Sequence, residues 1–92
     1  MSRYGKTDHN QSDIVQDLRS TGASVQSLHA VGQGVPDLLV CLGKQLFLLE
    51  IKQPKSRKRL SQAQIDFHAK FPTSVVTSSE EALRAIGVLP WI

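Results

Sequence analysis

Hydrophobic and polar positions recur along the chain with two different spacings, which separates the expected helices from the expected strands. Apolar residues stand three and four positions apart at Ile14, Val15 and Leu18, a pattern that predicts an amphipathic helix over roughly 11–21. The following segment, 23–30, predicts a short strand. The chain is therefore expected to open with a helix followed by a strand.

The most apolar part of the chain lies at its centre, as two runs separated by a turn. Residues 38–42 are almost continuously apolar, as in a strand that is covered on both faces of its sheet. Residues 43–44 form the turn, and 45–52 is the returning strand. Pro36 lacks a backbone donor, so the first of these strands is expected to start at about Asp37.

The second half of the chain predicts a helix, a strand and a final helix. Ser61 is the candidate N-cap of a helix that continues to about residue 70. A strand over 73–77 and a helix over 78–87 follow. The residues available to pack the first of these helices are Ala63, Ile65 (or Gln64) and Phe67. The predicted fold class is thus α/β, in the order helix, three strands, helix, strand, helix.

Composition indicates one ordinary globular domain over 1–92, with 40% hydrophobic and 21% charged residues. No apolar run is long enough to cross a membrane, and the first residues lack the apolar stretch of a signal peptide, so a cytoplasmic protein is expected. Cys41, the single cysteine, is expected to be a buried apolar residue without a disulfide partner. Residues 1–9 are expected to be loose. The apolar tail 88–92 either contacts a partner or folds back onto the core.

Charged side chains stand where the central strands begin and end. Asp37 enters the first strand, and Glu50 and Lys52 leave the second. Because side chains two apart on a strand share a face, Glu50 and Lys52 project together. Buried charge is costly unless it is paired or binds a metal. Two converging carboxylates, with the backbone carbonyl of Ile51 as a third oxygen, suit Mg²⁺ or Mn²⁺.

The reaction that such a site predicts is hydrolysis of a phosphodiester. A divalent metal neutralises charge on a phosphate and acidifies water, while Lys52 either orients or deprotonates the attacking water or stabilises the developing charge. The simpler alternative is that Asp37 caps a turn and that Glu50 and Lys52 form a surface ion pair. Because Glu-x-Lys triplets are common, spacing alone does not decide between these interpretations.

A basic segment directly follows the proposed site. The chain carries a net charge of +3, and most of the excess lies in Lys52, Lys55, Arg57, Lys58 and Arg59. Such residues would contact phosphates near the cut, which gives affinity rather than sequence specificity; the alternative is a solvated loop. No aromatic residue interleaves with this run, so duplex or branched DNA recognised by shape is favoured over base stacking.

Three motifs resemble one nuclease family. Gly34-Val35-Pro36-Asp37-Leu38 followed by Glu50-Ile51-Lys52 resembles the signature of the PD-(D/E)xK nuclease superfamily. Together with Leu60-Ser61-Gln62-Ala63-Gln64, it looks more specifically like the virus-type replication-repair nuclease (VRR-NUC) domain of small stand-alone phage and prophage proteins. The similarity covers about 10–87. It implies a restriction-endonuclease-like core of αβββαβα order, with a mixed four-stranded sheet flanked by helices.

The resemblance also implies roles for individual residues. Asp37 and Glu50 become metal ligands, Lys52 becomes the catalytic lysine, and Gln64 becomes a polar helix residue that faces the site. The family often places a glutamate on the first helix, where this chain has Gln11. A neutral amide would ligate metal weakly, although it could bind a metal-bound water. The acidic residues that could substitute for it are Asp13 and Asp17.

The resemblance implies a Mg²⁺- or Mn²⁺-dependent endonuclease that acts as a homodimer on branched DNA such as a four-way (Holliday) junction. A two-fold dimer would place two sites on two strands. One alternative is a non-catalytic DNA-binding module that retains the fold, for which Gln11 is the main support. Another is an interaction protein in which Glu50-Ile51-Lys52 is incidental. A phage-encoded member would act in the cytoplasm of the host cell.

Overall fold

The structure, a computed structural model, describes residues 10–56 and 59–90. The order of the main elements agrees with the sequence prediction. They are α1 (Asn10–Ser20), β1 (Ser24–Ser27), β2 (Leu38–Leu42), β3 (Gln45–Ile51), the short 3-10 helix η2 (Pro54–Ser56), α2 (Gln62–Lys70), β4 (Ser74–Val76) and α3 (Ser79–Ala85).

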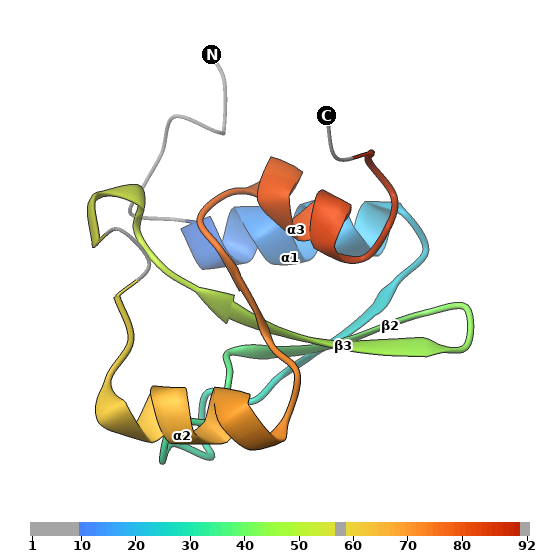
Figure 1. The fold of residues 1–92 in the computed structure, drawn as a ribbon. Coiled ribbons are helices and arrows are strands. Elements are labelled where there is room, and N and C mark those ends of the chain that lie inside the picture. The colour runs from blue at the N-terminus through green and yellow to red at the C-terminus, as the bar shows by residue number, and fades with distance from the viewer. Residues whose placement is uncertain (1–9, 57–58, 91–92) are drawn as a thin grey trace.

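The four strands form one mixed sheet in the order β1-β2-β3-β4. β1, β2 and β3 are antiparallel neighbours, whereas β4 pairs with β3 in parallel. A parallel pair needs a crossover connection, and α2 supplies it. Helices α1 and α3 lie side by side on one face of the sheet, and α2 lies on the other (Figure 1).

The apolar core lies between the sheet and the pair α1 and α3. On β2, Leu38 and Val40 are fully buried, and on β3 so is Leu49. Side chains alternate between the faces of a strand, so the residue after Leu49 points the opposite way, toward α2. The remaining core residues are Ile14, Leu18, Ala23, Val76, Ala82 and Ile86. This alternation places Glu50 on the α2 side of the sheet.

Helix α2 packs differently from the sequence prediction. The sequence predicts packing by Ala63, Phe67 and either Ile65 or Gln64; Ala63 and Ile65 are exposed, Phe67 is half-buried, and Gln64 is the one of the two alternatives that faces inward. None of the nine residues of α2 is fully buried. The physical reason is that α2 covers the end of the sheet where Glu50 projects, so its inward side carries the polar Gln64.

The face of the sheet on the α2 side is only partly covered. Cys41 is half-buried, so the prediction that it is buried is wrong.

β1 contains four residues and is shorter than the predicted 23–30. The backbone nitrogen of Leu28 still donates to the carbonyl of Asp37 (2.8 Å), which extends the pairing beyond the strand itself.

The described part of the apolar tail lies against α3. The backbone nitrogens of Val88 and Leu89 both donate to the carbonyl of Leu83, at 2.9 and 3.3 Å. Leu89 is half-buried, whereas Val88 is exposed. Residues 91–92 of the predicted tail contact lie outside the described residues. Within the described ranges, no helix has the length and apolar character needed to cross a membrane.

Candidate active site

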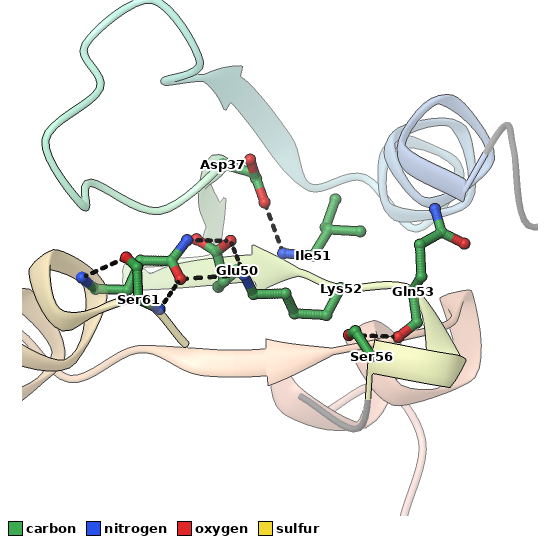
Figure 2. Close-up of polar contacts among 8 residues, drawn as sticks. Asp37, Glu50, Ile51, Lys52, Gln53, Ser56 and Ser61 are labelled. Atoms are coloured by element: carbon green, nitrogen blue, oxygen red, sulfur yellow. Dashed lines mark hydrogen bonds and ion pairs between the residues drawn. The ribbon is translucent and has the colours of Figure 1, made fainter. Parts of the chain in front are cut away.

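Asp37 and Glu50 lie across from each other at the adjoining ends of two central strands. Leu38 pairs with Leu49 in the antiparallel register, and continuing that register by one residue places Asp37 opposite Glu50. Opposite residues of an antiparallel pair share a face. The Oδ2 atom of Asp37 accepts a hydrogen bond from the backbone nitrogen of Ile51 at 2.7 Å, which holds the carboxylate against β3 (Figure 2).

Glu50 is an acid in a protein interior, with only 4% of the residue exposed. Its pKa is raised from 4.5 to about 7, mainly by burial and then by the negative charge of Asp37 and a hydrogen bond with that carboxyl, while Lys52 partly opposes the rise. Two neighbouring carboxyl groups resist ionising together. Glu50 therefore favours either a proton or a nearby cation.

Lys52 and Gln64 complete the network around Glu50. The Nζ atom of Lys52 donates to the Oε1 atom of Gln64 at 3.0 Å and lies 3.8 Å from Glu50 Oε2. The Nε2 atom of Gln64 in turn donates to Glu50 Oε2 at 3.0 Å. The ammonium group therefore points at the carboxylate, and the Gln64 amide bridges them.

The side-chain amide of Gln64 also caps the N-terminus of helix α2. The Oγ atom of Ser61 accepts from the backbone nitrogen of Gln64 at 3.2 Å, while Gln64 Oε1 accepts from the backbone nitrogen of Ser61 at 2.9 Å. These reciprocal bonds form a capping box. The Oε1 atom of Gln64 thus accepts hydrogen bonds from both the backbone nitrogen of Ser61 and the Nζ atom of Lys52. The position at which α2 starts therefore fixes the orientation of the Gln64 amide.

Gly34 brings the loop before β2 against the first turn of α2. Its φ of +82° is a left-handed conformation, and a Cβ atom added to it would collide with the carbonyl of Ala63 and lie 3.0 Å from the nitrogen of Gln64. Only a glycine permits this approach. The loop that carries Asp37 and the helix that carries Gln64 are therefore packed backbone to backbone.

Helix α1, which the resemblance implies at the site, contributes no side chain to the hydrogen bonds described above. Gln11 lines a surface pocket of about 590 Å³ whose other lining residues also belong to α1, and the hydrogen bonds of the site described above do not include it. Among residues 10–56 and 59–90, no group of three or more His, Cys, Asp or Glu side chains could hold a metal. The acidic donors that the site brings together are Asp37 and Glu50.

The predicted DNA-binding segment follows the site directly. Lys55 lies in η2 and is exposed, as is Arg59, whose Nε atom donates to the carbonyl of Ser56 at 3.3 Å. Ser56 is itself held by a bond from its Oγ atom to the carbonyl of Gln53 at 2.7 Å (Figure 2). The other two predicted residues, Arg57 and Lys58, lie outside the described residues.

His68 is a neighbour of the site for which the sequence analysis proposes no role. It lies one helical turn after Gln64, and its Nε2 atom is buried without a hydrogen-bond partner among the described residues. Burial and the charge of Lys52 lower its pKa, which favours the neutral imidazole. The four-residue spacing from Gln64 is the signal in the sequence that places it here.

In this arrangement the two carboxylates are hard oxygen donors of the kind that a divalent cation prefers, and the ammonium of Lys52 is a donor to a phosphate group. Comparisons of the chain with protein-family models, with curated proteins and with solved structures found no match.

Gly34→Ala should destabilise the protein more than Gly32→Ala. Both glycines have a left-handed φ, which costs an L-residue roughly 1–2 kcal/mol, but a Cβ at Gly32 has nothing within 4 Å. We expect a further loss of about 1–3 kcal/mol for Gly34→Ala from overpacking against Ala63. Urea unfolding gives the free energies, and hydrogen exchange at Gln64 reports the start of α2. Equal losses in the two variants would contradict the backbone contact.

Glu50→Gln should stabilise the metal-free protein at alkaline pH. Because the folded-state pKa of Glu50 is raised from 4.5 to about 7, its stability contribution is complete below pH 4.5 and falls as the pH rises through 7. Wild type should therefore lose up to about 3 kcal/mol of unfolding free energy across this window, and Glu50→Gln should not show that loss. Glu80→Gln, which removes an exposed carboxylate, is the matched control for urea unfolding at both pH values. A fall of the same size in Glu50→Gln and wild type would refute the assignment.

Proposed function

We propose that this chain is a metal-dependent, structure-selective DNA endonuclease with a PD-(D/E)xK core, similar to the VRR-NUC domain. The observation that carries the proposal is the convergence of Asp37 and Glu50 on one face at adjoining strand ends, with Lys52 held beside them. The α/β fold, a mixed four-stranded sheet flanked by helices, agrees with the core that the resemblance implies.

The donor atoms at the site fit Mg²⁺ or Mn²⁺. The carboxylates of Asp37 and Glu50 are hard oxygen ligands. The backbone N–H and C=O groups of one strand residue point toward the same neighbouring strand. Since the nitrogen of Ile51 bonds to Asp37, its carbonyl faces that side too and supplies a third oxygen. A small number of carboxylates completed by waters is the usual environment of Mg²⁺.

The energetics of the site also favour a cation. The raised pKa of Glu50 reflects burial and the neighbouring Asp37, so a divalent ion would replace the proton that otherwise neutralises Glu50. When bound, the metal supplies positive charge that polarises a phosphate and acidifies water. Asp37 and Glu50 would hold that ion in place.

The other side chains would act on the phosphodiester. The ammonium of Lys52, whose side chain is 21% exposed, lies beside Glu50 and would either stabilise charge on the phosphate or orient the attacking water. Gln64 accepts from Lys52 and donates to Glu50, so it would position both groups without touching the reacting atoms. His68 lies on the same face of α2 as Gln64, and its lowered pKa favours the neutral imidazole.

DNA is the substrate that the charge distribution supports. Lys55 and Arg59 are exposed immediately after the site, and Arg57 and Lys58 add two charges to the same segment of the sequence. Such residues contact phosphates irrespective of sequence. A homodimer acting on a four-way junction is the specific form that we propose, because a two-fold pair of sites matches two strands of a branched substrate. The site of action would be the cytoplasm, of the host cell if the protein is phage-encoded.

A non-catalytic DNA-binding module is the second candidate. Gln11 stands where the family often has a glutamate. Among the described residues, the site brings together two acids rather than three. Such a module would hold branched DNA with or without metal and would not cut it.

Cleavage of labelled four-way-junction and linear duplex DNA tests the proposal. In Mg²⁺ or Mn²⁺ the wild type should cut the junction faster than the duplex, and chelation should stop it. Asp37→Ala and Lys52→Ala should each slow cleavage more than about a hundredfold while retaining DNA binding. Glu80→Gln, at an exposed acid on α3, should cut like wild type.

Two outcomes would change the conclusion. Tight junction binding by wild type without cleavage in either metal would favour the binding module. Cleavage that persists in Asp37→Ala would rule out this site.

A further inference from the structure

An aromatic pair lies at the C-terminal end of α2, on the helix that carries Gln64. The rings of Phe67 and Phe71 are stacked, with centroids 4.6 Å apart and planes 28° from parallel. Phe67 is half-buried, whereas Phe71 is 49% exposed. A stacked ring whose outer surface meets solvent is a platform on which another flat ring can stack.

The pair forms one wall of a small pocket of about 270 Å³. Its other lining residues are Gln33, Ala63, Asp66 and Lys70. Drug-sized ligands occupy pockets of about 300–1,000 Å³, so this pocket suits a single ring system. It thus combines an aromatic wall with a polar rim in a space of the size of one nucleobase.

The polar rim offers hydrogen-bond donors and acceptors to the edge of a base. Gln33 has a left-handed φ of 58° and is, among the described residues, the only non-glycine with a positive φ. Such strained residues occur at ligand clamps. Asp66 is held by a bond to its Oδ1 atom from Gln62 Nε2 at 2.9 Å, which leaves its other oxygen to accept from an amino group of a base. Lys70 supplies an ammonium for the attached phosphate.

The pocket lies close to the candidate active site along the chain. Gln33 directly precedes Gly34, whose backbone packs against Ala63, and Asp37 is four residues further. Four extended residues span at most roughly 14 Å. One strand of B-form DNA advances about 3.4 Å per nucleotide. The pocket is therefore within about four nucleotides of a phosphate held at Asp37 and Glu50.

We propose that this pocket binds one unpaired nucleobase, stacked on Phe71, near the phosphate that is cut. The proposal rests on the proposed function and deepens it, because it supplies a physical basis for preferring branched DNA. In a continuous duplex every base is paired and stacked, whereas a base displaced at a branch or bulge is free to enter. No aromatic residue interleaves with the basic run in sequence, but Phe67, Lys70 and Phe71 line this pocket at the C-terminal end of the helix that carries Gln64.

Equilibrium binding to bulged DNA tests this proposal without requiring cleavage. The probe is a short duplex with one unpaired 2-aminopurine, compared with the same duplex fully paired, in the presence of a chelator. Wild type should bind the bulged duplex about tenfold more tightly and quench the 2-aminopurine fluorescence. Phe71→Ala should lose both effects, and Phe71→Trp should retain them.

Ile65→Ala is the matched control, because Ile65 is on the same helix, is 48% exposed and does not line the pocket. It should behave like wild type. Gln33→Gly tolerates the left-handed φ and removes only the amide, so it should fold normally and weaken bulge binding. This second variant keeps the test valid if Phe71→Ala unfolds.

The failures of the two proposals are distinguishable. Equal binding of bulged and paired DNA by wild type, or equal effects of Phe71→Ala and Ile65→Ala, would overturn the nucleobase pocket and leave the nuclease proposal standing. Failure of wild type to bind either duplex would overturn the nucleobase pocket, whereas the nuclease proposal is overturned only by the junction experiments described above.

Discussion

The buried carboxylate of Glu50 is the constraint around which this end of the molecule is arranged. An isolated charge in an interior costs several kcal/mol, so it must be neutralised, hydrogen-bonded or both. Lys52 approaches it from the residue that follows β3, and Gln64 bonds to it from α2. Asp37, directly before β2, works against ionisation of Glu50 rather than for it. An arrangement selected for stability alone would not place a second acid there.

This constraint explains features of the fold that otherwise look unfavourable. Helix α2 contains no fully buried residue because it covers charged and polar groups rather than an apolar face. Its first turn is secured instead by the capping box of Ser61 and Gln64 and by the close approach of Gly34. The apolar core lies on the other face, under α1 and α3, and anchors β2 and β3, which position Asp37 and Glu50. The apolar core and the charged and polar cluster thus lie on opposite faces of one sheet.

Local patterns in the sequence predict much of this arrangement. The order of helices and strands, the cap at Ser61 and the common face of Glu50 and Lys52 follow from residue type and from the period of two along a strand. These features depend on neighbours in the sequence, so the residues themselves carry the signal. The three motifs around Asp37, Glu50 and Gln64 also identify the side chains that the fold brings together.

The spacing of apolar and polar residues does not predict contacts between residues that are far apart in the chain. The exposure of Ala63 and Ile65 depends on which face of the sheet α2 covers, and the half-burial of Cys41 depends on how much of that face α2 leaves open. The contact of Gly34 with Ala63 joins residues far apart in the chain. Gln11 shows the same limit, because alignment to a family pattern predicts a role that the network of Asp37, Glu50, Lys52 and Gln64 does not include.

The location of Mn²⁺ in crystals of the protein tests the central claim most directly, because the ion scatters anomalously and substitutes for Mg²⁺. We predict one anomalous peak per chain, about 2.0–2.3 Å from carboxylate oxygens of Asp37 and Glu50 and near the carbonyl of Ile51. The peak should be absent in Asp37→Asn crystals grown in the same way. A peak elsewhere, or none at these two carboxylates at millimolar Mn²⁺, would contradict the account.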